Sequence, residues 1–172
     1  MAHQFAFVDE IKVSDFKMVA VVMEATTMPS IRRELQGLRL RGQRRIHMRR
    51  ESLQRKTTLL SKVSKFNFVV VVTSSSKKSE AEARQEALGN LIDELILLRV
   101  RHIEIERDES FEKFDNVLIA NKLRLSHAGI VPTYRHLSPW EEPLLWLADI
   151  VAWGVENRAE QLIRQVSSKN PD

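Results

Sequence analysis

The 172-residue sequence contains no cysteine, which excludes both a disulfide framework and a thiolate zinc site. It has no run of about eighteen apolar residues, so we expect no transmembrane helix, and its start lacks the pattern of a secretory signal. Glycine-rich phosphate loops and Gly-x-Ser-x-Gly nucleophile motifs are also absent from the sequence. These absences predict a cytoplasmic protein without a membrane partner, and the length predicts one domain.

Positive charge is concentrated in one segment. The chain carries a net charge of +4, but residues 32–56 hold ten basic and two acidic side chains, which leaves the remainder at −4. A basic segment on an acidic body predicts a polyanionic partner, either DNA or RNA. The alternative is a basic surface that is simply solvated. The residues expected to contact phosphates are Arg39, Arg41, Arg44, Arg45, Arg49 and Arg50.

The hydrophobic pattern begins with two β-rich runs, at residues 5–8 and 18–23, which favour an antiparallel hairpin. Helical spacing follows at 29–38 and 50–66, and residues 46–48 are a candidate edge strand between them. The remaining elements alternate between strand and helix, at residues 67–73, 80–98, 101–106, 111–123, 130–134 and 138–154.

Strands separated by helices imply parallel pairing through crossovers. We therefore expect an α/β fold with a mixed sheet, in which an antiparallel hairpin is followed by parallel strands and helices cover both faces. Residues 1–165 are predicted to form this single domain, with 157–165 continuing the last helix or adding a turn, and residues 166–172 to form a frayed tail.

The most apolar helix-length segment, residues 138–154, contains one ionisable group within its apolar run, Asp149. A buried carboxylate must find a partner, bind a metal or take up a proton. Ser138 and Glu141 predict a capping box at the start of the helix, and Glu142 should share a helical face with Asp149. The helical spacing of the tryptophans favours core packing over a base-stacking platform; they are Trp140, Trp146 and Trp153.

Acidic residues also follow two of the predicted strands, as Asp9-Glu10 and as Glu106 and Asp108. Strand ends form the crevice of many α/β folds, so these carboxylates are expected to converge with Asp149. Carboxylates without cysteine suit magnesium or manganese, and two such ions about 4 Å apart support phosphodiester hydrolysis. The structural alternatives are turn and helix caps for the strand-end acids and an arginine ion pair for Asp149.

Four elements resemble, in order, a family of uncharacterised and mostly bacterial proteins, domain of unknown function 3800. Residues 7–10 (Phe-Val-Asp-Glu) are similar to its opening strand, and residues 45–48 followed by Glu51-Ser52 resemble its Leu-His-Trp/Phe element. Residues 105–108 resemble its acidic strand end, and residues 142–152 are similar to its closing helix, often Glu-Pro-Leu-Leu-Trp-Leu-x-Asp. The sequence has Ile11 where the family often has serine.

The resemblance implies a ribonuclease H-like fold, with acidic residues where that superfamily binds catalytic metals. By position it implicates Asp9, Glu106 and Asp149 as metal ligands, although the middle acid stays open between Glu104, Glu106 and Asp108. The ribonuclease H fold has three antiparallel strands, and residues 46–48 would have to supply the third. The second choices for catalytic residues are Glu10, His47 and Glu142.

His47 lies in a basic stretch, where it is either a surface residue or a group that contacts a phosphate or assists proton transfer. Our first hypothesis is a magnesium- or manganese-dependent nuclease, or a related phosphotransfer enzyme, that binds nucleic acid through the arginines. The alternative is a non-catalytic nucleic-acid-binding or protein-interaction module on the same fold. A third hypothesis is an oligomeric structural protein with an exposed tryptophan helix.

Overall fold

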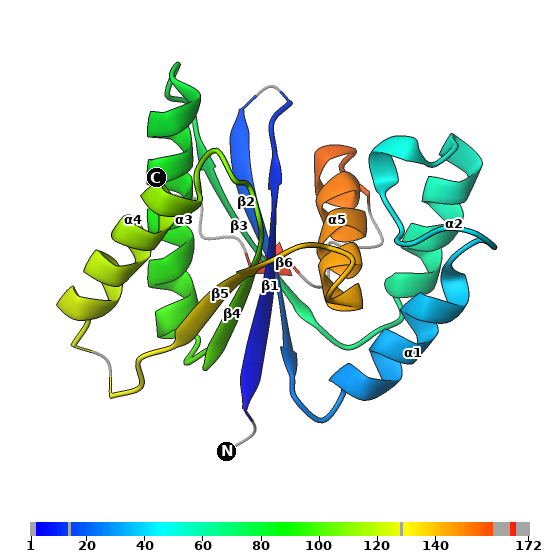
Figure 1. Ribbon diagram of the computed structural model, residues 1–172, viewed down its shortest axis with the longest axis horizontal. Helices are drawn as coiled ribbons and strands as arrows, with labels where there is room; N and C mark the ends of the chain where they lie inside the picture. Colours follow the sequence, from blue (N-terminus) through cyan, green and yellow to red (C-terminus); the bar gives the residue numbers. More distant parts are fainter. Residues whose placement is uncertain (1–2, 14, 128, 160–165, 168–172) are drawn as a thin grey trace.

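The structure is a computed structural model that describes residues 3–13, 15–127, 129–159 and 166–167. Its helices cover both faces of a central sheet (Figure 1). The strands are β1 (Gln4–Ile11), β2 (Phe16–Glu24), β3 (Val69–Ser75), β4 (His102–Glu106), β5 (Thr133–Leu137) and β6 (Val166–Ser167). The helices are α1 (Met28–Leu38), the 3-10 helix η1 (Met48–Arg50), α2 (Leu53–Val63), α3 (Glu80–Leu97), α4 (Glu112–Leu125) and α5 (Pro143–Glu156).

The sheet has the strand order β5-β4-β1-β2-β3-β6. Strands β1, β2 and β3 are joined in antiparallel pairs. Strand β4 runs parallel to β1, β5 runs parallel to β4, and β6 runs parallel to β3. The expected mixed sheet, with a hairpin followed by parallel strands, is confirmed.

The prediction of a third strand at residues 46–48 is wrong. Ile46 and Met48 are 1% exposed and pack in the core against α5, while the chain turns into η1. Alternating buried and exposed residues imitate a strand here, because a short irregular segment can bury every second side chain without pairing. The third antiparallel strand is β3, which follows α1 and α2.

The alternation of side chains along β1 and β2 builds two cores. Phe7 and Val19 face α1, α2 and α5, whereas Val8 and Met18 face α3. Both strands are covered by helices on each side, as Figure 1 shows, which explains their nearly continuous apolar sequences. Successive residues therefore reach opposite faces of the sheet, and this decides where the acidic residues at the strand ends point.

Helix α5 is buried between the sheet and the pair α1 and α2. Its side chains are apolar nearly all round, as expected of a helix packed on several sides. Trp146 is 2% exposed, and its neighbours Leu145 and Leu147 are fully buried. Trp153, further along the helix, is partly exposed, and the hypothesis of an oligomeric structural protein stays a prediction.

The start of α5 corrects the predicted capping box. The N-cap residue is Glu142, whose carboxylate accepts a hydrogen bond from the backbone N–H of Leu144. Ser138 instead begins a turn before the helix, in which its backbone N–H donates to the carboxylate of Glu141 at 2.7 Å. The first backbone N–H groups of a helix have no partner within the helix, and proline has no N–H. Proline is therefore well suited to the first helical position, and the helix begins at Pro143. Trp140 lies in the turn and outside the helix.

The chain after α5 is described only in part. The predicted helical continuation over 160–165 lies outside the described residues, as do 168–172 of the predicted tail. Val166 and Ser167 of that tail pair with Val70 and Val71 of β3. Of the helices within the described ranges, none is long and apolar enough to cross a membrane.

Candidate active site

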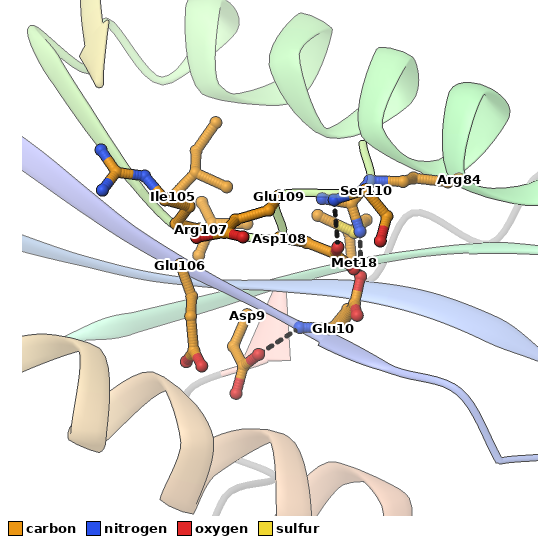
Figure 2. Close-up of a pocket in the computed structure, with 11 residues that line it drawn as sticks. Asp9, Glu10, Met18, Arg84, Ile105, Glu106, Arg107, Asp108, Glu109 and Ser110 are labelled. Atoms are coloured by element: carbon orange, nitrogen blue, oxygen red, sulfur yellow. Dashed lines mark hydrogen bonds and ion pairs between the residues drawn. The ribbon is translucent and has the colours of Figure 1, made fainter. Parts of the chain in front are cut away.

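Strand pairing brings two predicted acids together. Val8 of β1 pairs with Ile105 of β4 in parallel register, so the next residues, Asp9 and Glu106, lie side by side at the strand ends. Because Val8 and Ile105 belong to the α3 core, the residues after them point to the opposite face. Figure 2 shows the carboxylates of Asp9 and Glu106 directed toward α5.

Asp149 reaches the same place from α5. Its Oδ2 atom accepts a hydrogen bond of 2.8 Å from the backbone N–H of Met48, so the partner in this structure is the main chain at the start of η1. Asp149, Asp9 and Glu106 line one pocket of about 740 Å³ together with His47, Lys56 and Trp153. We call this cavity the carboxylate pocket. It joins acids from β1, β4 and α5 that are far apart in the sequence.

The surrounding protein makes ionisation of these acids unfavourable. Burial raises the pKa of Asp9 well above its ordinary value, and the negative charges of Glu106 and Asp149 raise it further. Burial raises the pKa of Glu106 to about 7 in spite of the opposing charge of Arg45. Burial also raises the pKa of Asp149, although the hydrogen bond from Met48 opposes the shift. In the metal-free pocket the ionised forms of all three carboxyl groups are therefore unfavourable.

Arg45 is the cation that pairs with Glu106, one of the acids of the pocket. Its Nη1 atom lies 3.5 Å from Oε1 of Glu106, and its Nη2 atom lies 2.6 Å from Nδ1 of His47. Burial and the charge of Arg45 lower the pKa of His47. A guanidinium can only donate, so Nδ1 of the neutral imidazole accepts and its proton resides on Nε2.

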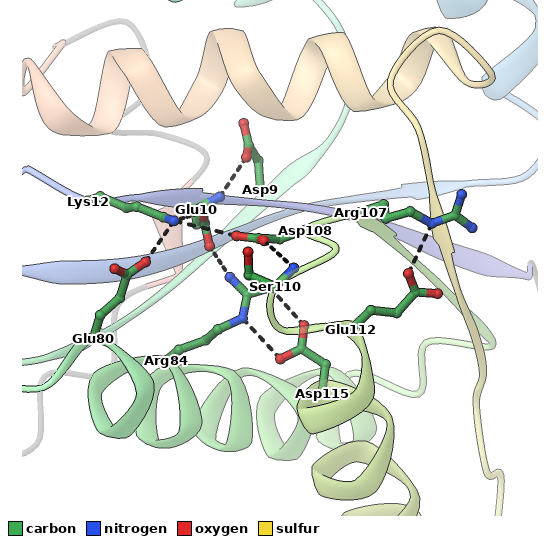
Figure 3. A network of polar contacts seen from close by, with 10 residues as sticks. All are labelled: Asp9, Glu10, Lys12, Glu80, Arg84, Arg107, Asp108, Ser110, Glu112 and Asp115. Carbon is green, nitrogen blue, oxygen red and sulfur yellow. Dashed lines mark hydrogen bonds and ion pairs between the residues drawn. The ribbon is translucent and has the colours of Figure 1, made fainter.

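Glu10 borders the carboxylate pocket, but its carboxylate does not join that of Asp9, since the next residue of a strand faces the other side of the sheet. Its carboxylate pairs with Arg84 of α3 and, at 2.9 Å, with Lys12 (Figure 3). Arg84 is 2% exposed and also binds Asp115 of α4 at 2.7 Å, so this network ties β1 to α3 and α4. A smaller cavity of about 350 Å³ adjoins it.

The other two candidates for the middle acid have different surroundings. Glu104 is held by Arg135 of β5 at 2.6 Å. The Oδ1 atom of Asp108 accepts a hydrogen bond of 3.0 Å from the backbone N–H of Ser110 on the α3 side. Of the three, only Glu106 lines the carboxylate pocket.

Glu142 also lies away from Asp149. As the N-cap of α5 it precedes the helix, and its two oxygens each bind Arg32 of α1 at 2.8 Å. Glu142 stands just outside the helix that carries Asp149 and does not line the carboxylate pocket.

The predicted phosphate-binding arginines lie between α1 and α2. Arg45 is partly buried, whereas Arg39, Arg41 and the other three are exposed. Arg49 lines the carboxylate pocket. Within the described ranges, no ion pair neutralises the exposed ones, which are Arg39, Arg41, Arg44, Arg49 and Arg50.

Comparison with solved structures shows which known folds this chain is similar to. The chain is similar to RNase HII in its complex with PCNA from Archaeoglobus fulgidus, with a TM-score of 0.60 and 14% identity over 96% of this chain and 83% of that one. It is also similar to a point mutant of Bst-RNase HIII, with a TM-score of 0.53 and 13% identity over 95% of this chain and 55% of that one. The chain has an RNase H-like fold. At these identities the likeness extends to the fold alone.

No family model matches the chain, and no curated protein matches it. The resemblance to domain of unknown function 3800 therefore rests on the quoted motifs, while the RNase H-like fold that it implied is confirmed. Among the described residues, no group of three acidic or histidine side chains is arranged to hold a metal ion as it stands.

Sequence reasoning missed the contacts that surround the acids. The backbone N–H of Met48 as partner of Asp149 carries no sequence signal, because any residue except proline supplies that donor. Arg84, by contrast, does carry a sequence signal. It stands in the helical stripe of Ala83, Ala87 and Leu88, and an arginine within a buried stripe indicates an ion pair.

Proposed function

We propose that the protein is a nuclease dependent on magnesium or manganese, in which Asp9, Glu106 and Asp149 hold the metal. The observation that carries the proposal is the shared pocket: acids from β1, β4 and α5 converge on one cavity of an RNase H-like fold. Neither a cap nor a turn requires such a meeting. The two RNase H neighbours support hydrolysis of phosphodiesters as the reaction class.

The donor set fits a hard divalent cation. Carboxylate oxygens are the ligands that magnesium and manganese prefer. Burial raises the pKa values of all three acids, and neighbouring negative charges add to the shift for Asp9 and Glu106, so a bound cation would favour their ionised forms. Sharing one ion requires the side chains to turn toward each other. When bound, the metal supplies an activated water and stabilises the leaving oxygen.

The chain's own residues supply binding and orientation. The exposed arginines contact the phosphates of the strand, which positions it without reading its sequence. His47 is neutral and, while Arg45 occupies Nδ1, presents the N–H of Nε2 as a donor for a phosphate oxygen. Its role under these conditions is hydrogen bonding, and it cannot accept a proton at Nε2.

A non-catalytic nucleic-acid-binding module is the second candidate. The contacts that the acids already make within the protein favour it. Arg45 already lies against Glu106, Met48 already donates to Asp149, and the backbone N–H of Glu10 already donates to Asp9, so all three acids have protein partners without a metal. In that case the carboxylates would hold the loop before α2 in place and the arginines would bind without cleavage.

Metal-dependent stability distinguishes the two candidates. A cation that binds only the native state raises the melting temperature with concentration. We expect manganese to stabilise the wild type and to have little effect on Asp149→Asn. Asparagine retains an oxygen that can accept from Met48, so the variant should fold.

Asp93→Asn is the matched control, since this exposed carboxylate pairs with Lys122 on the surface. It should respond to manganese as the wild type does. Cleavage of labelled RNA and DNA, single-stranded and as a hybrid duplex, then identifies the substrate. Equal melting of wild type and Asp149→Asn at every manganese concentration would remove the basis of the nuclease proposal.

A further inference from the structure

Trp140 is an exposed aromatic side chain on a rigid support. It is 57% exposed, in contrast to the buried Trp146. The turn that carries it is closed by two hydrogen bonds between Ser138 and Glu141, and the preceding Pro139 accepts a hydrogen bond from the indole of Trp146. The ring is therefore presented to solvent by a fixed backbone, which limits the entropy lost when a ligand stacks on it.

A cation accompanies the ring. The guanidinium carbon of Arg44 lies 5.6 Å from the ring centroid of Trp140, within cation–π range. Arg39 donates a hydrogen bond of 3.2 Å to the backbone carbonyl of Arg44 and lies over the ring of Trp146. No ion pair with a carboxylate engages Arg44 among the described residues. An aromatic face thus lies beside positive charge that remains available to an anion.

Two chain segments connect the aromatic site with the carboxylate pocket. Arg44 immediately precedes Arg45, whose guanidinium contacts Glu106. On the other side, Trp140 follows β5 by three residues, and the last residue of β5, Leu137, pairs with Glu106. A strand whose phosphate lay at Glu106 would have neighbouring nucleotides within reach of Trp140.

We infer that Trp140 and Arg44 form a subsite for one unpaired nucleobase and its phosphate, next to the carboxylate pocket. The base stacks on the indole ring, and Arg44 contacts the phosphate. This inference rests on the proposed function for the identity of the ligand and adds that the bound strand is single-stranded at this point. A base inside a duplex has no free face for the indole, whereas an unpaired base stacks on aromatic rings regardless of its sequence.

The test measures binding to labelled oligonucleotides in a metal-free buffer, where cleavage is prevented. We expect Trp140→Ala to weaken binding of single-stranded DNA and RNA about tenfold, and to leave binding of a blunt duplex of the same sequence unchanged. Trp140→Phe should retain most of the affinity, because phenylalanine also stacks. Phe114→Ala is the matched control, since Phe114 is 58% exposed on α4 beyond the opposite face of the sheet.

Arg44→Gln tests the phosphate contact separately. It should reduce the salt slope of single-strand binding by about 0.7, the value for one phosphate contact. Trp140→Ala should leave that slope unchanged, because stacking releases no counterion.

Three results would overturn the inference: unchanged single-strand affinity in Trp140→Ala, an equal loss on single strand and duplex, or a wild type that binds only duplex. Equal loss would indicate a general docking surface. None of these results bears on manganese stabilisation of the wild type, so the nuclease proposal can stand when this inference fails. Conversely, Trp140→Ala could lose single-strand binding selectively while manganese leaves the melting temperature of the wild type unchanged. That result would support the subsite and refute the nuclease proposal.

Discussion

Replacing Glu106 by glutamine in the metal-free protein should stabilise it at high pH. Burial raises the pKa of Glu106 from 4.5 to about 7. Between these values the native state keeps a proton that the unfolded state has lost, so stability falls as pH rises through this window. The side chain is 24% exposed, so solvent screens the effect only in part.

The magnitude follows from the pKa shift. One pKa unit corresponds to about 1.4 kcal/mol, so the carboxylate costs roughly 3 kcal/mol of native stability well above pH 7 and less than 1 kcal/mol near pH 5. Glutamine keeps the shape and removes the charge. We therefore expect the free energy of unfolding of Glu106→Gln, relative to wild type, to rise by about 2 kcal/mol between about pH 5 and pH 8.

Urea unfolding in EDTA at both pH values measures this difference. Glu112→Gln is the matched control, because Glu112 pairs with Arg107 on the surface and its replacement should have a small effect that hardly varies with pH. A difference between Glu106→Gln and wild type that is independent of pH, or a variant that becomes relatively less stable at pH 8, would refute the reasoning.

Three further predictions concern the surroundings of the pocket. Arg84→Ala should lower the free energy of unfolding by about 3–5 kcal/mol in urea titrations, because it leaves the buried carboxylate of Asp115 unpaired, whereas the exposed Arg107→Ala should cost about 1 kcal/mol or less. Burial lowers the pKa of His136, whose ring nitrogens have no hydrogen-bond partner in the described structure. The free energy of unfolding should therefore fall as pH drops below about 6.5, and it should fall less in His136→Phe. Thermal unfolding at several pH values measures this difference. Arg45→Gln should increase manganese affinity about fivefold in calorimetric titrations, since a positive charge beside the pocket is removed.

The position of Asp9 and Glu106 could be predicted from the sequence because it depends on regular structure. The strand pattern of β1 and β4, together with parallel pairing through a crossover, brings their ends to one edge of the sheet. Because successive side chains of a strand point to opposite faces of the sheet, Asp9 and Glu10 face different sides, and so do Glu106 and its neighbours. Asp149 could be singled out as a charge within an apolar helix.

Other features depend on tertiary contacts that no local pattern records. Residues 46–48 alternate as a strand would, but the packing of Ile46 and Met48 against α5 decides their conformation. Trp140 matches the helical spacing of the other tryptophans, yet the proline at position 143 starts the helix after it. The ion pair between Glu142 and Arg32 requires α1 to lie against α5, which the sequence does not reveal.

The central claim is that Asp9, Glu106 and Asp149 share a divalent cation. A crystal structure of the protein soaked in manganese, with anomalous diffraction recorded, tests this most directly. The account predicts a manganese peak in the carboxylate pocket, bound by oxygens of all three residues, with Arg45 displaced from Glu106. A pocket without a peak at saturating manganese, with Arg45 still against Glu106 and Met48 still donating to Asp149, would contradict it.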